Sequence, residues 1–263
     1  MAVDPRLAEF GRDVLGRGAG EIGMHLHAWN SPPLDVTVSD DDARHATYLI
    51  DYPASVLGEK GRFMTGLLED TFGVKMRSRR AGRWAMDERY ARALADCGYT
   101  VDCSVTPGLS WRRNAGAPGK AGGSDYRRFP RRPYFVDLDD IARPGDSELL
   151  EVPMTTHAAA ALAALPDTRL VGSLQDRLAV WLRPKGTRHD AARWALRRSL
   201  ARGDEVAMFM LHSSELMPGG SPTFRDAAAI EDLYVELEAV FALAAATCVA
   251  MTLAEYRANY DRR

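Results

Sequence analysis

Two histidines, His25 and His27, stand two residues apart in a short apolar segment of this 263-residue chain. The run over residues 21–29 predicts a strand, in which residues i and i+2 point to the same face. Two imidazoles on one face can hold a divalent metal. Imidazole nitrogen is neither a hard nor a soft ligand, and this suits zinc. The alternative interpretation is a pair of hydrogen-bonded histidines that binds nothing.

A third histidine, His212, directly follows the apolar run 206–211, which predicts a buried strand. The carboxyl ends of such strands are where α/β sheets and barrels build their sites. Glu215, three residues further on, could hold the imidazole in one tautomer. A competing interpretation makes Ser213 or Ser214 a nucleophile, but the turn pattern G-x-S-x-G is absent.

The run Arg80-Ala81-Gly82-Arg83-Trp84 lies between a predicted strand and a predicted helix. An arginine at such a turn can bind a carboxylate through two hydrogen bonds or steer an anion. The alternative is a solvated basic turn, which Arg77 and Arg79 would extend.

Strands and helices alternate along the chain, which predicts an α/β architecture with a mostly parallel sheet or barrel. We expect helices over residues 5–15, 56–72, 86–97, 190–202 and 224–247, and strands over 21–29, 74–79, 99–105, 149–154 and 206–211. Asp4 is a plausible helix N-cap, and Gly73 is expected to end the second helix. The Gly- and Arg-rich segment 107–133 predicts a loop, whose aromatic residues Trp111, Tyr126 and Phe129 could shape a substrate groove.

The composition excludes several classes of protein. Apolar residues make up 46% and charged residues 27%, and the net charge of −2 argues against a nucleic-acid partner. Three cysteines form no disulfide framework, and no signal peptide is visible, so we expect a cytoplasmic protein. No apolar run reaches the ~18 residues that a membrane span requires, and residues 240–253 predict a buried core helix.

Several segments, in order, resemble motifs of the polysaccharide deacetylases, the carbohydrate esterases with a NodB-homology domain. They are Gly20–His25, Arg80–Trp84, Leu94–Tyr99, Cys103–Pro107, Leu149–Pro153 and Met210–Glu215. The resemblance implies one domain over residues 1–263, folded as a distorted parallel β/α barrel that is missing its first strand. It also implies metal-dependent removal of acetyl groups from N-acetylated or O-acetylated sugars.

The resemblance assigns roles to individual residues. His25 corresponds to a metal ligand, Arg80 to the arginine that orients the catalytic base, and His212 to the general acid. Leu211 corresponds to the apolar lining of the acetyl pocket, and the neighbouring Arg83 and Trp84 are expected to contact the sugar.

This chain departs from the family pattern in two places. The second metal histidine of the family falls on Trp29, so His27 is the candidate for the second ligand. No strand ending in two aspartates precedes His25. Unless upstream residues or the loop with Asp40, Asp41 and Asp42 supply that carboxylate, we expect weak or no deacetylase activity. The alternative function is an N-terminally truncated, non-catalytic relative that binds glycan or a partner chain.

Overall fold

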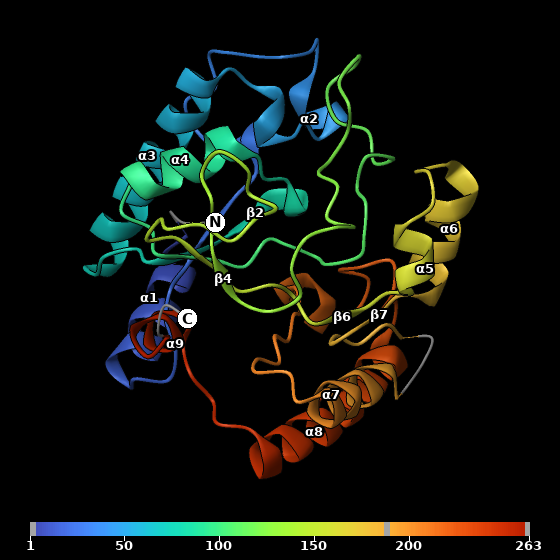
Figure 1. The fold of residues 1–263 in the computed structure, drawn as a ribbon. Coiled ribbons are helices and arrows are strands. Elements are labelled where there is room, and N and C mark those ends of the chain that lie inside the picture. The colour runs from blue at the N-terminus through green and yellow to red at the C-terminus, as the bar shows by residue number, and fades with distance from the viewer. Residues whose placement is uncertain (1–3, 187–189, 261–263) are drawn as a thin grey trace. The chain divides into compact units, whose positions relative to one another are not determined.

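The chain divides by its internal contacts into two compact units, each described by itself (Figure 1). The computed structural model describes residues 4–186 and 190–260, so His189 lies outside the described residues. The first unit comprises residues 1–105, 110–152 and 251–263, and the second comprises 106–109 and 153–250. The single domain expected over residues 1–263 stays a prediction.

The first unit is built on a five-stranded sheet in the order β1-β2-β3-β5-β4. Its strands are β1 (Met24–Leu26), β2 (Ser78–Ala81), β3 (Val101–Asp102), β4 (Tyr134–Phe135) and β5 (Leu150–Glu151). Neighbours are parallel from β1 to β5, and only β4 runs antiparallel, at the edge of the sheet. The mostly parallel α/β sheet is thereby confirmed. In the described part of the chain this sheet has β1 and β4 as its ends and does not close into a barrel.

The helices of the first unit begin and end where local chemistry predicts. They are α1 (Pro5–Gly16), α2 (Asp42–His45), α3 (Ala54–Phe72), α4 (Glu88–Asp96) and α9 (Leu253–Ala258), with short 3-10 turns η1 (Ala28–Asn30), η2 (Leu49–Asp51) and η3 (Gly82–Trp84). The Asp4 carboxylate accepts from the Arg6 N–H at the start of α1, as an N-cap does. Gly73 ends α3 with φ 70°, a left-handed conformation that costs glycine little.

Helices α3 and α4 pack on each other, and α3 also contacts β1 (Figure 1). Met24 and Leu26 of β1 belong to the same buried cluster as Leu57 of α3 and Leu94 of α4. Burying each such side chain stabilises the fold by about 1.5–3 kcal/mol. This core fixes one face of β1, and His25 between the two apolar residues lies on the opposite, exposed side.

The segment 107–133 is a loop, as predicted, although several of its side chains are deeply buried. The Tyr126 ring is fully buried and its hydroxyl donates to the Trp84 carbonyl at 2.5 Å. Phe129 packs edge-on against Tyr126 with ring centroids 4.8 Å apart. Two of the three aromatics expected to line a groove therefore anchor the loop to the first unit.

The second unit combines a two-stranded antiparallel ribbon with helices. The ribbon pairs β6 (Thr156–His157) with β7 (Val180–Trp181). The helices are α5 (Ala160–Ala163), α6 (Arg169–Leu178), α7 (Ala191–Arg202) and α8 (Ala227–Thr247), together with the 3-10 turn η4 (Ser213–Leu216). Helices α7 and α8 pack together (Figure 1), and Leu196 of α7 and Val240 of α8 share one buried cluster.

Two predictions for this part of the chain are wrong. Residues 206–211 form no strand: the Met210 N–H donates to the Leu182 carbonyl at 3.3 Å beside β7, but the pairing does not extend into a ladder, and the Phe209 ring packs 5.1 Å from the Phe241 ring of α8. Residues 240–253 form no buried core helix, since α8 ends at Thr247 and Phe241 is 50% exposed. Apolar composition alone did not specify which surface these residues would cover.

Among the described helices, none combines the length and the apolar character needed to cross a bilayer.

Candidate metal centre and its surroundings

The rings of His25 and His27 meet at the carboxyl end of β1. Their Nε2 atoms are 3.1 Å apart, and the rings stand nearly perpendicular with centroids separated by 4.8 Å. The two side chains share a face because they are two residues apart in extended backbone. The same-face prediction from the sequence is therefore confirmed.

The next strand fixes the tautomer of His25. In the register of β1 with β2, His25 lies opposite Arg80, and His25 Nδ1 is 2.9 Å from the Arg80 carbonyl oxygen. A carbonyl can only accept, so Nδ1 carries the hydrogen. In the neutral ring, Nε2 then presents its lone pair toward His27.

Gly82 allows the β2 turn to approach His27 closely. A Cβ at this position would lie 2.3 Å from the Leu26 carbonyl oxygen and 2.8 Å from His27 Nδ1. Any side chain would push the turn away from the histidine pair. After Gly82 the backbone enters the left-handed region, with φ 55° at Arg83 and 62° at Trp84, which is strained for residues with a Cβ.

The electrostatic surroundings favour a neutral His25. Burial of the ring, together with the positive charge of Arg80, lowers the pKa of His25 to about 4. Although the side chain as a whole is exposed, its ring nitrogens face the Arg80 carbonyl and His27. Near neutral pH the ring is therefore unprotonated, the form in which histidine coordinates metals.

His25 and His27 fit as two ligands of one divalent ion. Two nitrogens bound at about 2.0–2.1 Å to a tetrahedral zinc ion lie about 3.3–3.4 Å apart, close to the observed 3.1 Å. Within residues 4–186 and 190–260, no group of three or more His, Cys, Asp and Glu side chains is placed to hold a metal. The described residues therefore supply a two-nitrogen site, one ligand fewer than usual in catalytic zinc sites.

The predicted residues of the β2 turn have different surroundings. The Arg80 guanidinium is half-buried and lies 5.0 Å over the Trp84 ring. Trp84 is only 9% exposed and is stacked with Trp111 at a centroid distance of 6.4 Å. Arg83 donates to the backbone carbonyls of Ala46 and Ala115, contacts that hold the strained turn. A sugar contact for Trp84 or Arg83 stays a prediction.

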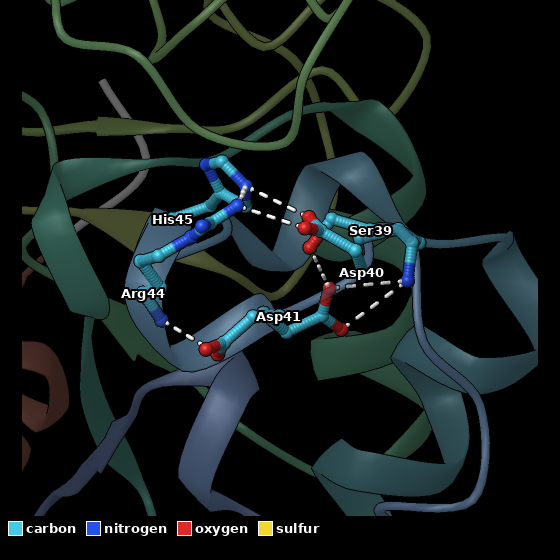
Figure 2. A network of polar contacts seen from close by, with 7 residues as sticks. Ser39, Asp40, Asp41, Arg44 and His45 are labelled. Carbon is cyan, nitrogen blue, oxygen red and sulfur yellow. Dashed lines mark hydrogen bonds and ion pairs between the residues drawn. The ribbon is translucent and has the colours of Figure 1, made fainter.

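The carboxylates of the acidic loop 40–42 bind to neighbouring residues of the same segment (Figure 2). Asp40 pairs with Arg44 at 2.8 Å and with His45 at 3.0 Å, and Asp41 caps α2 through the Arg44 N–H. Asp42 accepts from the Ser39 hydroxyl at 2.6 Å and from Tyr52. None of the three joins His25 and His27 in a metal-binding group of the described residues. The expectation that this loop supplies the carboxylate of the missing first motif is therefore not borne out.

In the second unit, His212 lies at the start of η4 with its side chain 46% exposed. Its Nδ1 is 3.4 Å from Glu215 Oε2, which also accepts from the His212 backbone N–H at 2.8 Å. The other oxygen of buried Glu215 accepts from Arg183 Nη2 at 2.5 Å. The expected contact between Glu215 and the imidazole is present, and Arg183 is a partner that the sequence did not indicate.

Leu211 is half-buried and packs on the cluster that contains Phe224 and Leu233 of the second unit. Its assignment to an acetyl pocket stays a prediction, as do the catalytic roles of Arg80 and His212.

Sequence reasoning missed a row of buried charge beside the site. Arg79, Asp102 and Glu151 are register partners on β2, β3 and β5, and each is at most 2% exposed. Arg79 Nε lies 3.1 Å from Asp102 Oδ1, and its guanidinium lies 4.0 Å over the Tyr90 ring. Burial and the neighbouring Asp102 raise the pKa of Glu151 well above its usual range. The available signal was an acidic residue, Asp102 and Glu151, within each of the mostly apolar runs 101–105 and 149–154.

No protein-family model and no curated protein matches the chain. Among solved structures, it is similar to a crystal structure from Mycobacterium smegmatis whose assignment as a polysaccharide deacetylase is provisional. The identity is 18%, the alignment covers 94% of this chain and 71% of the other, and the TM-score is 0.44.

Proposed function

We propose that this chain is a metal-dependent hydrolase that removes acetyl groups from N-acetylated or O-acetylated sugars of a polysaccharide or glycoconjugate. The supporting observation is the convergence of His25 and His27 through their Nε2 atoms, 3.1 Å apart. His25 ends a segment that resembles a deacetylase motif, and His27 follows two residues later. The proposal includes the distorted β/α barrel expected of that family.

His25 and His27 would hold the ion, and zinc is our first choice because it accepts imidazole in tetrahedral sites. A divalent ion at such a site lowers the pKa of a bound water to about 7 and polarises the acetyl carbonyl. The Arg80 carbonyl keeps the His25 lone pair directed at the site. The Arg80 guanidinium, packed on Trp84, is proposed to orient the carboxylate that acts as base.

His212 is proposed as the general acid that gives a proton to the leaving amine or hydroxyl. Its ring is accessible, and Glu215 contacts Nδ1, which leaves Nε2 to exchange a proton with substrate. A positioned general acid contributes about 10²–10⁴-fold to the rate.

The test combines metal analysis of the purified chain with acetate release from N-acetylated oligosaccharides. We expect zinc to bind, chelation to abolish acetate release, and added zinc to restore it. Acetate release that persists at full rate after complete metal removal would contradict the proposal.

A second candidate function is a non-catalytic relative that binds glycan or a partner chain. It is favoured by the absence of a third metal-binding side chain beside His25 and His27 among the described residues. Glycan binding without zinc uptake and without acetate release would support this candidate over the enzyme.

A further inference from the structure

A continuous chain of hydrogen bonds joins the buried carboxylate of Asp102 to the ring of His25. The Asp102 Oδ1 atom accepts from the Ser104 hydroxyl at 2.8 Å. Ser104 Oγ in turn accepts from the Ala81 N–H at 2.7 Å. This N–H and the Arg80 carbonyl belong to one peptide group, and the carbonyl accepts from His25 Nδ1 at 2.9 Å.

Every donor in this chain points the same way. The carbonyl fixes the hydrogen on His25 Nδ1, and the backbone N–H can only donate to the hydroxyl. With that lone pair occupied, the Ser104 hydrogen is directed at Asp102. The side chains of Asp102 and Arg79 form an ion pair at 3.1 Å, so the chain starts at a negative charge and ends at the imidazole.

Ser104 lies where the ladder between β2 and β3 ends, which explains why a side chain takes part in this chain of hydrogen bonds. The backbone ladder between β2 and β3 continues to Cys103, whose N–H donates to the Arg79 carbonyl at 3.0 Å. One step later the Ala81 N–H bonds to the Ser104 side chain instead of a carbonyl. The Ser104 N–H also donates to Asp102 Oδ2 at 3.0 Å, which fixes the hydroxyl at this point.

Burial makes these bonds strong. Ser104 and Asp102 are fully buried, and Ala81 is 1% exposed, so water does not compete for their polar groups. Bonds aligned in series polarise one another, with condensed-phase estimates of about 10–30% per bond. A carboxylate at one end thus makes the Arg80 carbonyl a better acceptor for His25.

We propose that Asp102 and Ser104 are positioning residues for His25, acting through the peptide group between Arg80 and Ala81. They keep the hydrogen of His25 on Nδ1 and the lone pair of Nε2 toward His27. The consequence for metal binding rests on the proposed function, whereas the control of the His25 tautomer does not depend on it.

The experiment compares the full-length chain with its Ser104→Ala variant. In metal-free protein, ¹⁵N chemical shifts of the His25 ring report the tautomer, and a zinc titration reports affinity. In the variant we expect a mixture of His25 tautomers and about tenfold weaker zinc binding, the lower end of the 10–100-fold cost of losing an outer-shell partner.

Thr65→Val is the matched control. Thr65 also has a buried hydroxyl in the first unit, bonded to the Gly61 carbonyl at 2.8 Å and to Tyr99, but it lies outside the hydrogen-bond chain. The control should keep the tautomer and the affinity of the wild type. If Ser104→Ala does not fold, Ser104→Cys preserves most of the volume while weakening both bonds, and we expect it to shift the tautomer in the same direction.

A His25 ring that stays entirely protonated on Nδ1 in the folded Ser104 variant, with unchanged zinc affinity, would overturn the inference. Failure of the wild-type chain to bind zinc would count against the proposed function instead. In that case the tautomer measurement alone still decides whether Ser104 positions His25.

Discussion

The two histidine sites of this protein are built in different ways. His25 and His27 lie at the end of a parallel strand, and their ring nitrogens face each other at 3.1 Å. His212 lies on a 3-10 turn, is 46% exposed, and has a carboxylate instead of another imidazole beside its ring. Behind the first site is a row of fully buried ionisable residues, whereas behind the second is one ion pair between buried Glu215 and the partly exposed Arg183.

Under the proposed function the two sites have different roles, metal binding at the first and proton transfer at the second. Two converging imidazole nitrogens, 3.1 Å apart, can bind a cation once the hydrogen between them is displaced, and their rigid sheet support reduces the cost of assembling a metal site. An exposed imidazole that contacts a carboxylate is suited to gain and lose a proton. Removing one component of one site at a time separates the two proposed roles.

The largest effect is expected from His25→Ala. This change removes one of two ligands, so zinc affinity should fall by more than the about 100-fold upper cost of losing an outer-shell partner, and acetate release should be lost. Metal analysis measures the zinc content, and a zinc titration measures the affinity. His45→Ala is the control, since His45 is bonded to Asp40 in the same unit and should leave the zinc content unchanged. Equal zinc content in wild type and His25→Ala would place the site elsewhere.

His212→Ala should separate proton transfer from metal binding. We expect turnover to fall about 10²–10⁴-fold while the zinc content stays that of the wild type. Steady-state acetate release beside metal analysis checks both. His157→Gln changes another histidine of the second unit, bonded to the Ala195 carbonyl at 3.0 Å, and should retain turnover. Normal turnover in His212→Ala would remove this residue from the mechanism.

Glu215→Gln tests the support of His212. It leaves Arg183 without its ionic partner at 2.5 Å, and hydrogen bonds to charged groups contribute about 1.5–3 kcal/mol. We expect the free energy of unfolding, measured with urea, to fall by that amount, together with a partial loss of turnover. Asp204→Asn, which removes the more exposed pair with Arg202, should cost less than about 1 kcal/mol. A loss as small as this in Glu215→Gln would show that the ion pair does not support the site.

A pH dependence of stability is expected in the first unit, with no change in either histidine site. Because the pKa of Glu151 is raised well above its ordinary value of 4.5, the folded protein keeps a proton that the unfolded chain loses. Stability should therefore fall as the pH rises above about 4.5, by up to about 1.4 kcal/mol per pH unit until the raised pKa is reached.

Glu151→Gln mimics the protonated side chain, so it should flatten this decline. Urea unfolding at a series of pH values from 5 to 8 measures the slope. An equally steep decline in the variant would assign the pH dependence to other groups.

Local patterns in the sequence determined the elements that hold the first site. The i, i+2 spacing of His25 and His27 predicted their shared face, because the side-chain period of a strand is two. Asp4 and Gly73 predicted a helix start and a helix end, since capping depends on single residues and their neighbours. The alternation of elements predicted the mostly parallel sheet in the same way.

The tertiary structure alone decided the contacts between distant segments. Residues 206–211 are as apolar as a strand, yet they form none, and Phe209 packs against Phe241 of α8. Arg79, Asp102 and Glu151 are far apart in sequence, and only the strand register places them in one row. The bond from Ala81 to Ser104 likewise exists only where β2 and β3 end together. A hydrogen bond or a buried contact needs two partners, and the identity of one partner does not specify the other.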